Sequence, residues 1–475
     1  MSLNGATRAS SEAVDNSFWS VLREAVWGTQ RDFTQGSLGV AIFILAVPMI
    51  IEMMAESLFA IVDIFFVSRL GSGAVAVVSI TESMMYLIYS VAIGLSIGAT
   101  ATVARRIGEK DTEGAAKAAT HSLYVGAFAS VVLGVIGVIF AADILRVMGA
   151  DESVVAEGTT FTRLMLGGNI VVMFLFMLNA IFRGAGDAAI AMRVLWFANI
   201  MNIILTPCFI FGLWIFPELG VTGAAVGTVL GRGVGVLFAS YKLFFAEKRF
   251  TIHKYHWLID WPRLWKLIKV SAPGILQFFI QTASWIGLVR VVTGFGVQAI
   301  AGYQIGIRVI IFALLPSVGL ANAAATLVGQ NLGAGQAGRA EKAVWKATLY
   351  NCIVQTSIGL LFVLFAEQIA GVFATEPDEF VFAVNAIRII AYGFFFYACG
   401  MVLETAFNGA GDTWTPTWIN FFIFWIFEIP LAYLLAYHFN MGPFGVFWAI
   451  TISFSLLAVV SGLLFRRGKW KLKTV

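Results

Sequence analysis

The chain is poor in charged residues and in cysteine. Of its 475 residues, 12% are charged and 59% are apolar, whereas about 25% of residues are charged in an average soluble domain. This composition excludes an ordinary water-soluble protein and favours a polytopic membrane protein. The three cysteines, Cys208, Cys352 and Cys399, are far apart in apolar stretches and show no metal-ligand spacing.

Enzyme motifs are missing as well. The chain contains no phosphate-binding Gly-Lys-Ser/Thr loop, no HExxH motif and no Ser/His/Asp grouping within its apolar segments. We therefore expect no enzyme activity, no cofactor and no nucleic-acid partner. The first 37 residues are polar and mixed, so we expect a retained segment rather than a cleavable signal peptide.

What the chain has instead is a series of long apolar windows. Windows near the ~20 residues that span a bilayer recur about twelve times. The predicted spans are 38–67, 74–103, 119–145, 157–182, 190–216, 221–246, 265–294, 299–329, 344–370, 381–407, 415–437 and 443–466. Basic residues concentrate in the loops after the second, fourth, sixth and eighth spans and in the C-terminal tail, so the positive-inside rule places both termini in the cytoplasm.

The two halves of the chain repeat each other in a single register without gaps. The matched positions are Pro48 with Pro273, Gly94 with Gly319, Gly108 with Gly333, and Arg183-Gly184-Ala185-Gly186-Asp187 with Asn408-Gly409-Ala410-Gly411-Asp412. Because odd and even spans keep their parity, the halves share one topology. We predict an all-α polytopic membrane protein with twelve transmembrane helices in two six-helix lobes related by a parallel internal repeat.

This duplication divides the chain into five parts. They are a cytoplasmic N-terminal segment (1–37), the N-lobe (38–246), a cytoplasmic linker between the lobes (247–264), the C-lobe (265–466) and a basic cytoplasmic tail (467–475). The amphipathic stretch at 18–27 either lies in the membrane interface or belongs to a loose cytosolic tail.

Three carboxylates lie on one stripe of the first span: Glu52, Glu56 and Asp63. Their spacings of four, seven and eleven residues correspond to about one, two and three helical turns. A carboxylate at the centre of a membrane helix costs about 2.5–3.5 kcal/mol, so such residues face a bundle interior or a water-filled cavity. The purely structural interpretation is that these carboxylates make a hydrogen bond or pair with an arginine on a neighbouring helix. The repeat-related positions hold Gln277, Gln281 and Leu288, so ion or proton coupling through this helix belongs to the first half.

Other polar groups lie deep in the predicted spans. Asn202, Thr206 and Thr228 offer oxygens for a hard cation such as Na⁺ if the fold brings them to Asp63. Pro48 removes a backbone hydrogen bond and permits the first helix to bend. The other polar candidates for a lumen are Glu52, Glu82, Asn179, Gln277, Gln281 and Glu404.

These features together resemble the multidrug and toxic compound extrusion (MATE) family over about residues 35–467. The resemblance rests on these motifs: Pro48 through Val62-Asp63, Arg105-Arg106-Ile107-Gly108, Phe182 through Asp187, Tyr303-Gln304-Ile305, Gly329 through Ala334 and Asn408 through Asp412. It implies two lobes around a central cleft and export of cationic or amphipathic compounds in exchange for H⁺ or Na⁺.

The resemblance also assigns roles. It makes Asp63 the coupling carboxylate, with Asn202 and Thr228 as its partners in an N-lobe cation site. Thr206 stands where relatives of the DinF-like branch carry an aspartate. Gln281 and Tyr397 stand where NorM-like relatives carry acids, so the chain is more similar to the DinF-like branch. Glu56 is a further coupling candidate.

We therefore expect a monomeric exporter of small organic molecules in the plasma membrane, which is the inner membrane in a bacterium. A related alternative is a flippase for lipid-linked oligosaccharides or other lipids, whose lumen would be cationic at Arg163, Arg290, Arg308 and Arg388. An alternative of another class is an intramembrane enzyme or a receptor-like protein.

Overall fold

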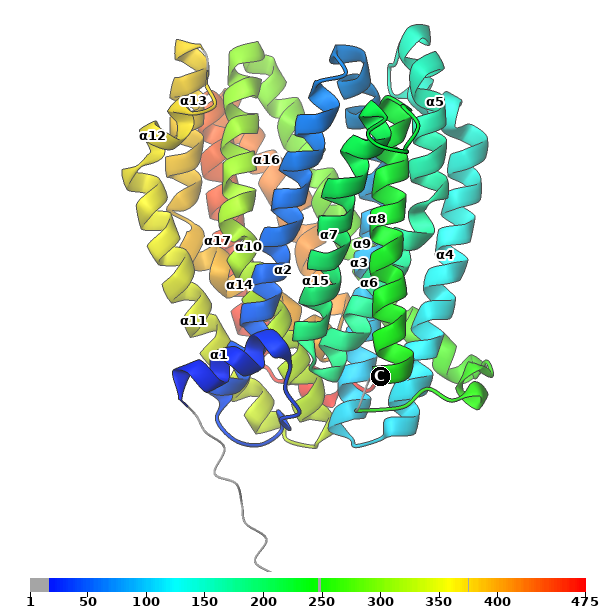
Figure 1. Ribbon diagram of the computed structural model, residues 1–475. Helices are drawn as coiled ribbons and strands as arrows, with labels where there is room; N and C mark the ends of the chain where they lie inside the picture. The colour runs from blue at the N-terminus through cyan, green and yellow to red at the C-terminus, as the bar shows by residue number, and fades with distance from the viewer. Residues whose placement is uncertain (1–16, 247–248, 375) are drawn as a thin grey trace, which may run out of the picture.

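The computed structural model describes residues 17–246, 249–374 and 376–475, and its regular structure there is helical throughout (Figure 1). Residues 1–16 of the predicted N-terminal segment and residues 247–248 of the predicted linker lie outside the described residues. Figure 1 shows long helices running side by side, with α1 lying across one end of the bundle. The C-terminal end of the chain lies at that same end, which is called the terminal end below.

Between residues 17 and 246, the described part of the first half, there are eight α-helices. They are α1 (Phe18–Trp27), α2 (Leu38–Ser68), α3 (Ser72–Gly108), α4 (Thr112–Val147), α5 (Glu152–Gly167), α6 (Asn169–Ala185), α7 (Ala188–Phe211) and α8 (Val221–Tyr241). A π-helical turn, η1 (Lys242–Ala246), extends α8, and a 3₁₀ turn, η2 (Lys254–Trp257), follows in the connection between the halves.

The helices of the second half follow in the same order. Its α-helices are α9 (Trp261–Val292), α10 (Val297–Gly333), α11 (Ala337–Leu364), α12 (Ala366–Gly371), α13 (Pro377–Ala391), α14 (Phe394–Gly409), α15 (Trp414–Asn420), α16 (Ile429–Tyr433) and α17 (Pro443–Arg466). The 3₁₀ turn η3 (Thr293–Phe295) precedes α10, and η6 (Lys469–Leu472) follows α17. The segments η4 (Phe421–Glu428) and η5 (Leu434–His438) are π-helical.

The predicted architecture of twelve spans is confirmed. Among the described residues, eleven helical segments are long and apolar enough to cross a bilayer, and one bent pair forms a twelfth span. That pair is α13 and α14, which meet at 58°. The predicted span over 381–407 corresponds to this bent pair, in which Tyr392 and Gly393 separate the two helices.

Repeat-related glycines join the two lobes. A Cβ on Gly94 of α3 would overlap the backbone of Ile275 in α9, and a Cβ on Gly319 of α10 would overlap the backbone of Ile50 in α2. Gly319 is the repeat counterpart of Gly94, and Ile275 is the counterpart of Ile50, so the two contacts are equivalent. The predicted repeat is thus expressed as a pseudo-twofold contact between lobes.

A second symmetric contact lies at the terminal end. A Cβ on Gly108 would overlap the carbonyl of Gln330, and a Cβ on Gly333 would overlap the carbonyl of Arg105. Side chains are excluded at both positions, so α3 and α10 approach each other closely there. The terminal end is therefore a close backbone contact between the lobes.

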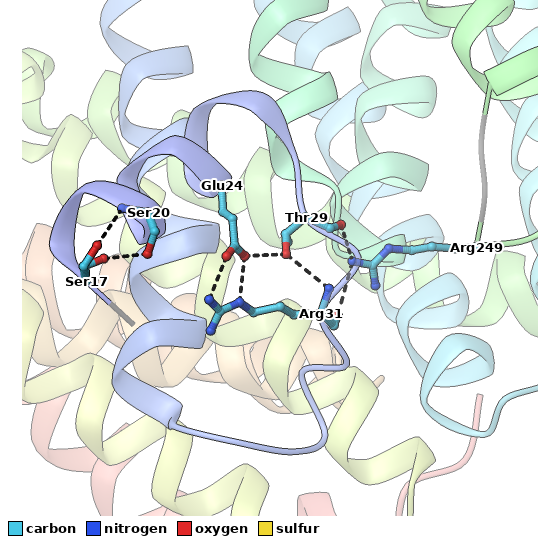
Figure 2. A network of polar contacts seen from close by, with 6 residues as sticks. All are labelled: Ser17, Ser20, Glu24, Thr29, Arg31 and Arg249. Atoms are coloured by element: carbon cyan, nitrogen blue, oxygen red, sulfur yellow. Dashed lines mark hydrogen bonds and ion pairs between the residues drawn. The ribbon is translucent and has the colours of Figure 1, made fainter. Parts of the chain in front are cut away.

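The N-terminal segment is bound to this end. Val21 and Ala25 of α1 are buried while Phe18, Trp19 and Trp27 are exposed, which is the amphipathic pattern of an interfacial helix. A polar network follows α1 (Figure 2). In it Arg31 forms two 2.7 Å hydrogen bonds to the Glu24 carboxylate, Thr29 donates to the same group, and Arg249 donates to the Thr29 carbonyl at 3.0 Å.

Both ends of the chain connect the lobes. Arg339 of α11 donates to the carbonyls of Gln35 and Gly36 at 2.8 and 3.0 Å, which ties the N-terminal segment to the second half. In the opposite direction, Arg105 and Arg106 of α3 donate to carbonyls of Lys473 and Val475 in the C-terminal tail.

The glycine contact at the terminal end is testable by substitution. Gly333→Ala should destabilise the protein by about 1–3 kcal/mol, because the new methyl group overpacks a backbone contact. Gly338→Ala in α11 is the matched control, since no atom lies within 4 Å of the position that its methyl group would take. Thermal unfolding of the purified protein in detergent measures both, and equal stability of the two variants would contradict the contact.

The Glu24–Arg31 pair predicts acid sensitivity of the N-terminal segment. Its hydrogen bond to Arg31 lowers the pKa of Glu24 below the ordinary carboxyl value. The stability it contributes is therefore present above that ordinary value and is lost as pH falls through the lowered pKa. Hydrogen exchange of residues 18–36, corrected for intrinsic rates, should accelerate in that acidic range. In Glu24→Gln the same segment should exchange faster at neutral pH and lose this pH dependence.

Candidate functional site

The three acids of α2 have separate surroundings. Glu52 is 2% exposed and faces α6, where Asn179 Nδ2 donates to Glu52 Oε1 at 3.5 Å and Arg183 Nη2 lies 3.8 Å from the same oxygen. In the sequence Arg183 appears only as part of the repeat motif, but the structure makes it the counter-ion of Glu52. Glu52 is therefore a structural link between α2 and α6.

Glu56, one turn further along α2, binds an arginine of the sixth span. Arg232 Nη2 of α8 donates to Glu56 Oε1 at 3.0 Å, and Asn199 Nδ2 of α7 donates to Oε2 at 3.5 Å. The side chain of Arg232 is 5% exposed, and its guanidinium lies over the Phe59 ring at 5.2 Å. Arg232 thus contacts α2 through an ion pair and a cation–π interaction.

The sequence-based site did not include Arg232. The signal was present, because an arginine between Gly231 and Gly233 in an apolar span meets the same criterion that drew attention to Asp63. What the sequence did not show is its orientation toward α2.

Asp63 lies two turns beyond Glu56 and keeps an oxygen without a partner. Its buried Oδ1 makes no hydrogen bond to any described residue. Asp63 interacts electrostatically with Glu82 of α3 and with Arg232, and Arg232 interacts with both Glu56 and Asp63. One buried guanidinium therefore attracts two carboxylates of the same helix. Of these two, only Glu56 accepts a hydrogen bond from it.

Asn202, Thr206 and Thr228 form a buried cluster of their own. Asn202 Nδ2 donates to Thr228 Oγ1 and Thr206 Oγ1 donates to Asn202 Oδ1, both at 3.1 Å. The contact requires glycine on α8, since a Cβ on Gly227 or Gly231 would overlap the backbone of Thr206 or Asn202. The structure brings these three predicted residues together, but no hydrogen bond among the described residues joins them to Asp63.

The remaining candidates are distributed over both lobes. Glu82 interacts electrostatically with Arg232 and with Arg308 of α10, so it lies between charges of the two lobes. In the second half, Gln277 and Glu404 are each 7% exposed, and each has a buried side-chain oxygen without a hydrogen-bond partner. Gln281 is half-buried on α9.

Pro48 lies four residues before Glu52, and α2 continues through it as one helix. Its repeat partner Pro273 likewise lies inside α9, where its carbonyl accepts a hydrogen bond from Thr417 at 2.9 Å. Pro48 leaves α2 one backbone hydrogen bond short just before the acid-bearing half. The position therefore suits a bend, because the three acids would move with that half of the helix.

Carboxylates outnumber arginines around Arg232. Among the described residues no group of three or more His, Cys, Asp or Glu side chains is arranged to hold a metal ion. Instead, Glu56, Asp63 and Glu82 interact with Arg232, and Glu82 also interacts with Arg308, which leaves three carboxylates to two arginines. An excess of negative charge favours the binding of a positive charge.

Known proteins show the same organisation. The MatE family profile matches residues 48–208 and again 273–434, so it recognises both halves. The chain is 26% identical over 431 residues to the "Probable multidrug resistance protein NorM" of Thermotoga maritima, covering 91% of this chain and 93% of that one.

Solved structures match over nearly the whole chain. A crystal structure of "MATE in the bent conformation" is 27% identical, with a TM-score of 0.86 and coverage of 92% of this chain and 96% of that one. A structure of "MATE in the straight conformation" is 26% identical, with a TM-score of 0.87 and coverage of 93% and 98%.

The buried ion pair can be tested by removing its arginine. Arg232→Met should destabilise the protein by about 3 kcal/mol, since it leaves Glu56 and Asp63 without a cation in an apolar environment. Adding Glu56→Gln to that variant should recover part of the loss, because one unpaired carboxylate is then removed. Thermal unfolding in detergent measures the cycle. Arg146→Met, which breaks an exposed pair on α4, should cost less than about 1 kcal/mol, and strictly additive effects of Arg232→Met and Glu56→Gln would refute the coupling.

Proposed function

The chain belongs to the MatE family of membrane transporters, and we propose that it exports amphipathic or cationic organic molecules in exchange for H⁺ or Na⁺. Members of the family are transporters, and the chain is accordingly not an enzyme. The observation that carries the proposal is the buried, unpartnered oxygen of Asp63 beside a guanidinium that it shares with Glu56.

The two charge states of Asp63 would hold α2 differently. When Asp63 is ionised, Arg232 is attracted both to Asp63 and to Glu56. When a proton or a cation neutralises Asp63, the attraction of Arg232 is left to Glu56 alone. The half of α2 beyond Pro48 is then less strongly held to α8 and bends at the proline. This bending changes how α2 packs against the other helices of the N-lobe.

Arg232 favours the proton over Na⁺ as the coupling ion. A sodium ion at Asp63 would have to approach a buried guanidinium that already compensates this charge, and the two cations would repel each other. A proton bonds to one carboxylate oxygen and needs no shell of oxygens. For Na⁺, the cluster of Asn202, Thr206 and Thr228 would have to break its own hydrogen bonds and turn toward Asp63.

Export then follows from competition. An organic cation and the coupling ion both favour the negative region around Asp63 and Glu82, so binding of one disfavours the other. This coupling is reciprocal, as any thermodynamic linkage between two ligands must be. The close glycine contacts at the terminal end support an outward-opening form of the transporter, with the lobes closed at that end.

Several finer assignments belong to the same proposal. The chain fits the DinF-like branch better than the NorM-like branch, because its acid stripe lies in the N-lobe while Gln281 replaces the acid of α9. We place the terminal end in the cytoplasm of a multi-pass protein of the plasma membrane, since the basic loops lie there. The predicted five-part division of the chain and its monomeric state are part of this proposal, as is the lack of a cofactor.

The flippase alternative is less well supported. It needs free positive charge in the lumen, whereas Arg388 binds Glu367 at 2.8 Å near the end of its helix.

Transport through reconstituted protein tests the role of Asp63. Asp63→Asn should reduce efflux of a fluorescent organic cation to the rate of empty liposomes, because the neutral amide removes the exchangeable charge. Asp143→Asn on the exposed face of α4 is the control and should transport normally. Imposing a pH gradient and a Na⁺ gradient separately should show that only the pH gradient drives the wild type. Normal efflux by a folded Asp63→Asn protein would overturn the proposal.

A further inference from the structure

The second lobe has a counterpart of the Asn202 cluster, and glycine contacts identify it. In the first lobe, a Cβ on Gly223 of α8 would overlap the backbone of Phe209 and Ile210. In the second, a Cβ on Gly445 of α17 would overlap the backbone of Leu435 and Ala436. Gly220 and Gly442, which immediately precede the two helices, have positive φ values of 54° and 60°. The pair formed by α8 and α7 is therefore equivalent to the pair formed by α17 and the segment from α15 to η5.

These contacts set the register between the halves. In the register that matches Pro48 with Pro273, Phe209 would correspond to Leu434, but the contacts pair it with Leu435, one position later. In the same register Gly223 would correspond to Trp448, but the contacts pair it with Gly445, three positions earlier. The π-helical segment η4 accommodates the extra residue before Leu435, and a shorter loop before α17 accounts for the other shift.

In this register Glu428 takes the place of Asn202. Asn202 faces Gly231, and the residue equivalent to Gly231 is Ser453. The residue equivalent to Arg232 is Phe454, whose ring stacks on Tyr397 with centroids 4.1 Å apart. The second lobe thus has an acid where the first has an amide, and an aromatic ring where the first has its buried cation.

Glu428, at the end of η4, and two polar residues of α10 and α17 each have a buried oxygen that lacks a partner. Glu428 is 1% exposed, Ser453 0% and Tyr303 1%. Glu428 Oε1, Ser453 Oγ and the Tyr303 hydroxyl each make no hydrogen bond to a described residue. Three buried, unsatisfied oxygens on α10, η4 and α17 are costly unless something binds them.

The charged surroundings of Glu428 contain no cation. Its titratable neighbours are Tyr303 of α10 and Tyr397 of α14, which interact with it electrostatically. No lysine, arginine or histidine among the described residues contributes to its electrostatic environment. A purely structural carboxylate would be expected to make hydrogen bonds or an ion pair, as Glu52 and Glu56 do.

We propose that Glu428 is the centre of a second monovalent-cation site, in the C-lobe, where Tyr303 and Ser453 supply neighbouring oxygens. The cation is a proton or Na⁺, since one carboxylate balances one positive charge and hydroxyl oxygens can accept from an acid proton or coordinate Na⁺. This site is independent of the role assigned to Asp63, because no residue is common to both. It differs from the first in taking its positive charge from outside the chain rather than from an arginine.

Infrared difference spectroscopy of the reconstituted protein tests this site. The measurement is made in the Asp63→Asn background, so that it does not depend on the proposed transport role of Asp63. A carboxyl band should still respond to a change of pH, or to Na⁺ replacing choline at constant pH, and the two conditions distinguish the proton from Na⁺. This response should be lost on addition of Glu428→Gln and kept on addition of Glu404→Gln, which alters another buried acid of the C-lobe.

A second, more conservative variant tests the site even if the Glu428→Gln protein does not fold. Tyr303→Phe removes only the hydroxyl and should shift the midpoint of the response by about tenfold in cation concentration, the effect of one hydrogen bond to a charged group. The proposal is overturned if Asp63→Asn shows no such band. A band that survives Glu428→Gln, one that disappears with Glu404→Gln, or a midpoint unmoved by Tyr303→Phe would also overturn it.

Discussion

A carboxylate inside an apolar bundle must be neutralised, hydrogen-bonded or paired, and this requirement organises the first lobe. Glu52 meets it through Arg183 and Asn179, and Glu56 through Arg232 and Asn199. These bonds connect α2 to α6, α7 and α8. Asp63 meets the requirement only in part, because its Oδ1 has no partner among the described residues. The helix is therefore held firmly near Pro48 and less firmly toward its far end, which is the distribution that a bending element needs.

The two lobes share their contacts but differ in their polar interiors. The contacts between lobes are symmetric, since Gly94 packs against Ile275 and, at the equivalent position, Gly319 packs against Ile50. Such contacts depend on close backbone approach, so a side chain on either glycine would separate the lobes. The interiors carry no such restriction. There Asn202 corresponds to Glu428, and Arg232 corresponds to Phe454, and this difference allows each lobe to handle charge in its own way.

The ends of the chain add to the closure of the terminal end. The N-terminal segment reaches Arg339 of the second half, while the C-terminal tail accepts hydrogen bonds from Arg105 and Arg106 of the first. All of these bonds use backbone carbonyls as acceptors, so they depend on the path of the chain rather than on the acceptor side chains. An inward-opening form would have to release them together with the glycine contacts.

Sequence alone determined the class of protein, the number of spans and the duplication, because hydrophobic length is a local property and the repeat is a comparison within one chain. It also identified Asp63, whose high cost in an apolar helix needs no knowledge of neighbours. Tertiary structure decided the partners. Arg232 is far from Glu56 along the chain, and only the packing of α8 on α2 turns it toward the acids. Likewise, the equivalence of Glu428 and Asn202 depends on one extra residue in a π-helical segment. Glycine contacts between helices reveal this shift between the halves, and the order of residues along the chain does not.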